Sequence, residues 1–239
     1  MTAITYLVKY EDEFGVGAAT IVNDGKKLRL TVRGVEFISH NFHSFSISST
    51  ADDSKRKLFN LFIGDLCGYS LNCQIPVLCV RGDGIEIPAM LHAHIEYGKP
   101  VDSRTRFHNS DGTEFEVNQQ IDTEILELEI EFQGKLYISK GRNQYNSFDE
   151  QLAELRDVLP SGVYLKTCWN CAFSDYHPAG SGIFGDLACF RNLKAEYRQV
   201  KDKFALMHLW NQRAESVQEV HLCPEFEKRK SGNGGFYVG

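Results

Sequence analysis

Alternation of apolar and polar residues dominates the first 145 residues of the chain. The clearest case is 125–132, where apolar positions alternate with Glu127, Glu129 and Glu131. Strict alternation over a short stretch is typical of a strand with one buried face. The pattern predicts about eight short strands, among them residues 4–10, 17–22, 27–35, 43–48, 72–80, 89–97 and 125–132. Pro76 suggests a sheet edge or a bulge within its strand, and the polar residues 98–122 are expected to form a long surface loop.

A helical period replaces the alternation near residue 147. Ser147 and Glu150 have the spacing of a capping box, and the apolar residues that follow are Leu152, Leu155 and Leu159. Pro160 is expected to stop this helix after about three turns. A longer helix is predicted after residue 189 by one apolar stripe spaced 3, 4, 3, 4, 3, which consists of Phe190, Leu193, Tyr197, Val200, Phe204 and Met207.

Together these patterns predict an α+β protein with two parts. Residues 1–145 are expected to form a mostly antiparallel β-sandwich or barrel-like domain. Residues 146–239 are expected to form a cysteine-rich, zinc-binding α+β region with one long helix. The two parts could pack as one unit.

Four cysteines in the second part are the strongest candidate for a chemical site. Cys168 and Cys171 form a C-x-x-C knuckle, and Cys189 and Cys223 can complete a tetrahedron. Because four thiolates leave no open position on zinc, such a site would be structural rather than catalytic. The alternatives are an iron–sulfur cluster, four free or buried thiols, or a histidine ligand from among His177, His208 and His221.

Five further patterns favour ordinary structural roles over chemical ones. His92 and His94 lie on one face of a strand, as do the glutamates of 125–132, and both sets are predicted to face solvent. Cys67, Cys73 and Cys79 are predicted to be small buried residues. The motif G-x-G-x-x-G at 180–185 lacks the preceding strand of a dinucleotide site. Basic residues near 191–203 are expected to be solvated.

Composition narrows the class of protein. The formal net charge of −6 lowers the expectation of nucleic-acid binding. The N-terminal residues do not resemble a signal peptide, and no apolar run reaches the ~20 residues of a membrane helix. A cytoplasmic protein is therefore expected, in which seven cysteines are more compatible with thiols and a metal site than with disulfides.

The C-terminal half resembles an uncharacterised bacterial family, a domain of unknown function. The resemblance is carried by C-x-x-C at 168–171, by CFRN at 189–192 with KAEY at 194–197, and by LCPEFE at 222–227. It extends over the whole chain but is specific only from about residue 160. It implies a bacterial origin and a shared cysteine framework, and it implies no activity.

Function is predicted only in outline. The leading hypothesis is a non-enzymatic protein-binding module of immunity or regulatory type, whose partner is another bacterial protein. One alternative is an enzyme with a site between the two parts that uses Asp175, Tyr176 and His177, or His92 and His94. Another is an iron–sulfur or redox protein.

Overall fold

The computed structural model describes residues 3–49, 51–108, 114–139, 147–178 and 184–230, with backbone only for 103–108 and 114–120. Most of the regular structure is antiparallel β, and the described helices are short. No helix in these residues is long and apolar enough to cross a membrane.

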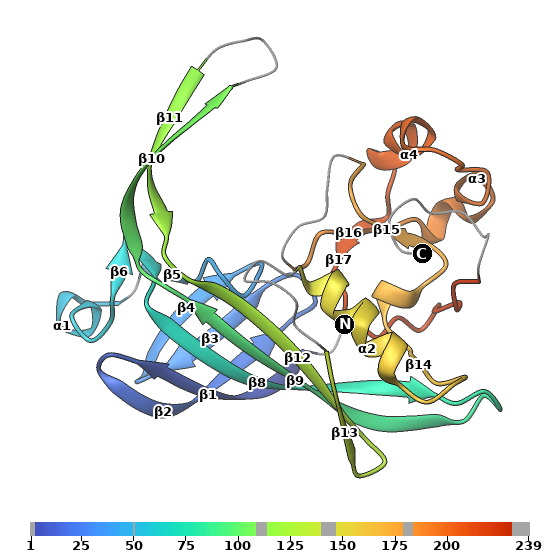
Figure 1. Ribbon diagram of the computed structural model, residues 1–239, viewed down its shortest axis with the longest axis horizontal. Coiled ribbons are helices and arrows are strands. Elements are labelled where there is room, and N and C mark those ends of the chain that lie inside the picture. The colour runs from blue at the N-terminus through green and yellow to red at the C-terminus, as the bar shows by residue number, and fades with distance from the viewer. Residues whose placement is uncertain (1–2, 50, 109–113, 140–146, 179–183, 231–239) are drawn as a thin grey trace.

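One twelve-stranded sheet forms the body of the protein (Figure 1). Its strands, in spatial order, are β13 (Lys135–Ile138), β12 (Glu124–Phe132), β9 (Glu86–Tyr97), β8 (Tyr69–Val80), β1 (Ile4–Asp12), β2 (Gly15–Asn23), β3 (Leu28–Val32), β4 (Val35–Ser39), β5 (Ser46–Ile47), β7 (Asp65–Leu66) and β6 (Leu61–Phe62), with β14 (Tyr164–Leu165) beside β8. Neighbouring strands are antiparallel throughout.

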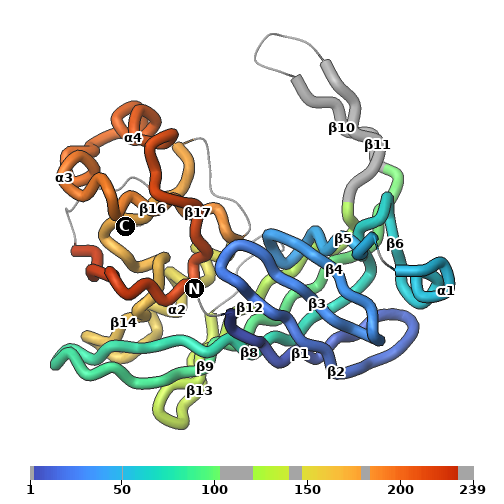
Figure 2. Tube along the Cα trace, turned by 180° about the vertical axis from the view of Figure 1, so that it is seen from behind, coloured from blue at the N-terminus to red at the C-terminus, as the bar shows by residue number. Residues whose placement is uncertain are grey.

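The remaining elements lie at two ends of this sheet. A hairpin of β10 (Pro100–His108) and β11 (Glu114–Ile121) projects from one end (Figure 1), and the C-terminal region lies at the other (Figure 2). That region contains a small sheet of β15 (Ser174–Asp175), β16 (Leu187–Cys189) and β17 (Glu215–Val217), and the helices α3 (Lys194–Tyr197) and α4 (Lys203–Trp210). Helix α1 (Asp53–Arg56) precedes β6, and 3₁₀ turns occur at Cys168–Asn170 and Arg191–Leu193.

Helix α2 (Phe148–Val158) covers the inner face of the sheet near β12 and β13. Its start matches the sequence prediction: Ser147 and Glu150 form both hydrogen bonds of a capping box. Phe148, Leu152 and Leu155 are buried against the inner residues of the strands. The same hydrophobic core includes residues on both sides of position 145, so the predicted parts share an interior. Their separation into two domains stays a prediction.

An aromatic cluster joins three distant segments in this core. The rings of Phe42 and Phe148 are 6.3 Å apart, and Phe184 lies 4.7 Å from Phe42 and 4.8 Å from Phe148. Phe42 follows β4, Phe148 begins α2 and Phe184 precedes β16. The cluster therefore ties the sheet, its covering helix and the C-terminal region together.

Three parts of the predicted fold are wrong. The strands form one open sheet that runs from β13 to β6, not two sheets of a sandwich. Residues 98–122 contain the hairpin of β10 and β11 instead of a long loop, because strands rich in polar residues lack the apolar alternation by which a strand is recognised. The predicted stretch 27–35 contains β3 and begins β4, with a turn at Arg33 and Gly34.

The prediction of one long helix after Cys189 is also wrong. Asp202 is extended, and its carboxylate accepts hydrogen bonds from the backbone N–H groups of Phe204 and Ala205, so a separate helix begins there. Phe190, Tyr197 and Val200 are buried, whereas Phe204 and Met207 are exposed and Leu206 is buried instead. Two separate short helices, α3 and α4, together produce the 3-and-4 spacing that predicted one long helix.

Substitution Phe148→Ala should destabilise the protein by about 3–5 kcal/mol, because it removes a fully buried ring from the cluster that joins the three segments. Chemical denaturation measures the loss. The matched control is Phe204→Ala, since Phe204 is 66% exposed and should change stability by less than about 0.5 kcal/mol. Equal losses in the two variants would contradict the placement of α2.

Candidate functional site

The outer face of the sheet, opposite α2, carries side chains in rows set by the strand register. Direct partners across neighbouring strands lie on the same face. One row consists of Leu136, Glu131, Met90 and Pro76. The next row consists of Ile138, Glu129, His92, Gln74 and Leu7. The rows change in character along the strands, from polar to apolar.

A polar hollow of about 850 Å³ crosses this face from β2 to β13. Its polar lining includes Asn72, Gln74, His92, His94, Glu127 and Glu129, and its edges include Leu7 and Leu136. His94 Nδ1 lies 3.0 Å from Asn72 Oδ1, and His94 Nε2 lies 3.0 Å from Glu96 Oε1. His92 and His94 are partly exposed, as the alternation predicts.

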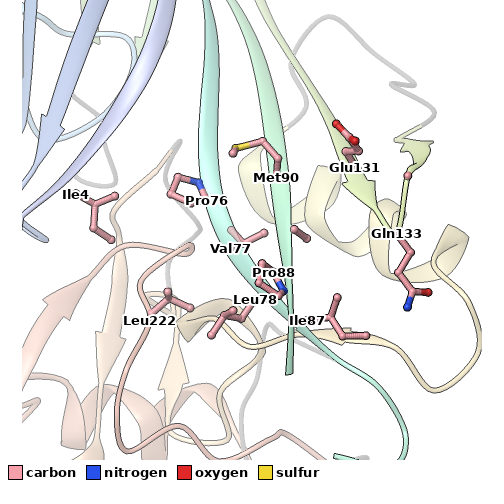
Figure 3. Close-up of a pocket in the computed structure, with 12 residues that line it drawn as sticks. Ile4, Pro76, Val77, Leu78, Ile87, Pro88, Met90, Glu131, Gln133 and Leu222 are labelled. Carbon is pink, nitrogen blue, oxygen red and sulfur yellow. The ribbon is translucent and has the colours of Figure 1, made fainter. Parts of the chain in front are cut away.

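An apolar groove of about 620 Å³ adjoins the hollow along the same strands (Figure 3). Its floor includes Pro76 and Leu78 of β8 and Pro88 and Met90 of β9. Ile4 and Leu222 lie at one end, and Glu131 and Gln133 lie at the other. The groove therefore offers apolar surface with a carboxylate at one end.

The groove lies where the β8–β9 ribbon extends beyond its neighbours. Pairing of β1 with β8 ends at Gln74, and pairing of β12 with β9 ends at Met90. Pro76 and Pro88 lie just beyond these paired stretches. Neither therefore needs to donate a backbone hydrogen bond to β1 or β12. This confirms the prediction that Pro76 marks a local edge of the sheet.

The structure brings the four C-terminal cysteines to one place. The thiol of Cys168 donates a hydrogen bond to the sulfur of Cys223, and Cys171 and Cys189 lie close enough to act on the Cys168 pKa. All four are buried, with 2–7% exposure, and none is in a disulfide. Cys189 ends β16 of the small sheet β15–β16–β17 (Figure 1).

Two members of this cluster have opposite pKa shifts. The hydrogen bond to Cys223, together with burial, holds the pKa of Cys168 well above its ordinary range. The same hydrogen bond lowers the pKa of Cys223 to about 6, and the backbone N–H of Glu225 contributes to this lowering. Arg191 Nη1 lies 3.9 Å from the sulfur of Cys189, while burial raises the pKa of Cys189.

The predicted metal-stapled region is nevertheless wrong as a description of this fold. In the part of the chain that the structure describes, no group of three or more His, Cys, Asp or Glu side chains has an arrangement that could hold a metal ion. Hydrogen bonding and packing hold the region together instead, including the contact of Cys168 with Cys223. A ligand role for the four cysteines, and zinc or an iron–sulfur cluster as cofactor, stay predictions that elemental analysis of freshly purified, reduced protein can test.

Asp175, Tyr176 and His177, which were predicted to form an enzyme site between the two parts, each contact different residues. Asp175 and Tyr176 are completely buried. Tyr197 donates a hydrogen bond of 3.0 Å to Asp175, and Tyr176 donates one of 3.1 Å to Glu219. His177 packs edge-on against Trp210. With no exposed surface on Asp175 or Tyr176, a substrate cannot reach them without opening the interior.

Glu219 is a buried carboxylate that sequence reasoning missed. It is fully buried between two valines, and its Oε2 accepts a hydrogen bond of 2.7 Å from the Gly185 backbone. Burial raises the pKa of Glu219 to about 7 despite this bond and the one from Tyr176. The neighbouring Gln218 reaches the sheet, where Asn23 donates to it at 2.5 Å. A Gln-Glu pair between Val217 and Val220 was the available signal.

The other sequence motifs add no site. Arg191, Lys194 and Arg198 lie near Glu215, Glu225 and Glu227, respectively, at 2.6, 3.5 and 3.4 Å. Cys67, Cys73 and Cys79 are buried, as predicted. Most of the glycine motif at 180–185 lies outside the described residues.

Comparison with known proteins places the chain in a family. The model of DUF6304, a family of unknown function, matches residues 4–174. Since the match covers more than half of the chain, this protein belongs to that family. The match crosses position 145 and ends before Cys189 and Cys223, so it does not test the predicted cysteine framework. Searches of curated proteins and of solved structures found no match.

Substitution Glu219→Gln should change how stability depends on pH. A carboxyl whose pKa rises from 4.5 to about 7 on folding stabilises the folded state while it is protonated. This contribution is lost as the carboxyl ionises. The parent should therefore lose stability as the pH rises from about 4.5 to about 7, by up to about 3 kcal/mol. The variant should lack this loss, so its advantage over the parent should grow between pH 5 and pH 8.

Urea denaturation at several pH values measures this difference. The matched control is Glu127→Gln, because Glu127 is exposed on the outer face. Parallel pH profiles for the parent and Glu219→Gln would show that folding does not raise the pKa of Glu219.

Proposed function

We propose that this member of DUF6304 is a non-enzymatic, cytoplasmic protein-binding module of immunity or regulatory type. Its outer sheet face would bind a positively charged surface of another bacterial protein. The observation that carries the proposal is the polar hollow, which combines glutamates with exposed leucines at its edges. Interfaces that bind specifically combine such apolar contacts with complementary charge.

The charge of the hollow supports a basic partner. Three outward residues of β12 are Glu127, Glu129 and Glu131, whereas the lysine that lines the hollow is Lys9. Lys9 lies 3.9 Å from Glu11, so a carboxylate already offsets its charge. The formal net charge of −6 adds to attraction at longer range.

Exposed apolar residues support a protein as partner. Leu7 is 62% exposed and Leu136 is 46% exposed, on opposite sides of the hollow. Each leucine would lose contact with water on binding and contribute about 25 cal/mol for each Å² of apolar surface covered. Their separation across several strands suits a macromolecule better than a small ion.

Site-specific photocrosslinking in the native bacterium tests the location. We expect p-benzoylphenylalanine at Leu7 or Leu136 to form one adduct of defined mass, because both positions would lie in the interface. The control position is Ile63, which is 88% exposed near the β6 end of the sheet. The same adduct at all three positions, or none at the leucines, would reject this face as the interface.

Charge reversal tests the charge complementarity. The partner that crosslinking identifies is purified by itself, and its binding to variants of this protein is measured. The double variant Glu127→Lys and Glu129→Lys should weaken binding at least about tenfold and reduce its dependence on salt. The matched control is Glu196→Lys, since Glu196 is exposed on α3, away from the hollow. Equal effects of reversal at the two places would exclude specific recognition by the hollow.

A further inference from the structure

The apolar groove is distinct from the hollow. Its lining combines outward residues of β8 and β9 with Val77, Ile87 and Ala89, which alternate with them along the same two strands. Its floor is formed by Pro76, Leu78, Pro88 and Met90, and these residues project from the same side of two paired strands. Prolines have no backbone N–H, and Leu and Met carry no strong hydrogen-bonding group. The floor therefore offers apolar contact and almost no competition from polar groups.

We propose that the groove receives an aromatic or long aliphatic side chain from an extended segment of the basic partner, with a lysine or arginine two positions away. This inference rests on the proposed function and specifies the kind of segment that binds. The apolar side chain would lie over Met90 and Pro88, and the basic one would lie among the carboxylates of β12.

The volume of the groove favours a segment of chain over a small ion. At about 620 Å³ it lies within the range of sites that bind small organic ligands. It is open to solvent along the ribbon and bordered at one end by Ile4 and Leu222 (Figure 3). An extended peptide can lie along such a groove with alternate side chains directed into it.

Glu131, together with Glu129, supplies the charge that selects a basic segment. Its side chain is 57% exposed, and it lies opposite Met90 in the register. Its ion pair with His92 has a separation of 3.9 Å between Oε2 and Nε2. This separation is long for an ion pair, so the exposed carboxylate stays accessible to a lysine or arginine of the partner.

The spacing of the rows defines the spacing in the partner. Met90 and His92 are two residues apart on β9, as are Glu131 and Glu129 on β12. Side chains two positions apart on an extended chain point to the same side and lie ~6.8 Å apart. A segment that places its apolar residue over Met90 thus places the residue two positions along over His92 and Glu129.

Methyl NMR of ¹³C-methionine-labelled protein tests this assignment directly. The sequence has three methionines, of which Met90 lies in the groove and Met207 is 49% exposed on α4. The probes are the capped peptides acetyl-Trp-Ser-Arg-amide and acetyl-Trp-Ser-Glu-amide. We expect the first to shift the Met90 methyl signal saturably and to leave Met207 unchanged, and the second to bind at least about fivefold more weakly.

The variant Glu129→Gln separates the charge from the apolar contact, because the register places the basic residue of the peptide over His92 and Glu129. It should weaken binding of the arginine peptide to within about twofold of the glutamate peptide, while both still shift Met90. The control Glu196→Gln should leave the preference unchanged. No Met90 shift up to about 5 mM peptide, or equal shifts of Met90 and Met207, would overturn the assignment.

Two further outcomes distinguish this inference from the function on which it rests. If Leu7 and Leu136 crosslink a partner while Met90 does not respond, the groove assignment fails and the function stands. If Met90 responds and the crosslinks are absent, the proposed function fails alone. A Met90 shift that depends on protein concentration without peptide would show that a second copy of the chain occupies the groove, which also overturns the proposal.

Discussion

A face of a single antiparallel sheet is buried only where another layer of the protein covers it. This requirement determines how the rest of the chain is arranged around the sheet. Strands β8 and β12 alternate so that one face is apolar, with Leu71, Ile75, Leu128 and Ile130 almost inaccessible to water. Helix α2 and the aromatic cluster of Phe42, Phe148 and Phe184 provide the cover. The side chains of the opposite face are partly or fully exposed, among them Leu7, Gln74 and Glu131.

The C-terminal region completes this cover, and buried polar groups determine how it attaches. Gln218 accepts a hydrogen bond from Asn23, which also donates to Tyr6, so the region contacts the sheet through specific partners. Glu219 and the four thiols lie in the same interior. Apolar packing alone would tolerate several orientations, whereas an unpaired buried amide or carboxylate would be costly in each incorrect one. We infer that these groups select one orientation.

The sequence predicted elements well where a regular pattern continued within one element. Alternation identified β1, β2, β8, β9 and β12, and the capping box at Ser147 located the start of α2. It failed where one period spanned two elements: the 3-and-4 spacing continues across Asp202, although this residue caps a new helix. Cysteine spacing raised the correct question about proximity, but spacing carries no information about the arrangement around an ion. The rows of the outer face depend on register between strands distant in sequence, which one strand's pattern cannot reveal.

The outward positions of β8 link the fold to the function. They are Ser70, Asn72, Gln74, Pro76 and Leu78, and the change from polar to apolar occurs after Gln74. This is also the last residue of β8 that pairs with β1. If the outward face of β8 beyond Gln74 were only solvated, its residues would be polar. If it were buried in the core, β1 would continue beside it. An apolar end on a ribbon that projects past β1 and β12 meets neither condition. Pro76 and Pro88 lack the backbone N–H that further pairing at their positions would use, and β14 pairs with β8 only beyond them, at Cys79 and Val80. Apolar surface held open in this way gains stability only when another molecule covers it, which is the physical basis for treating the ribbon as a contact surface.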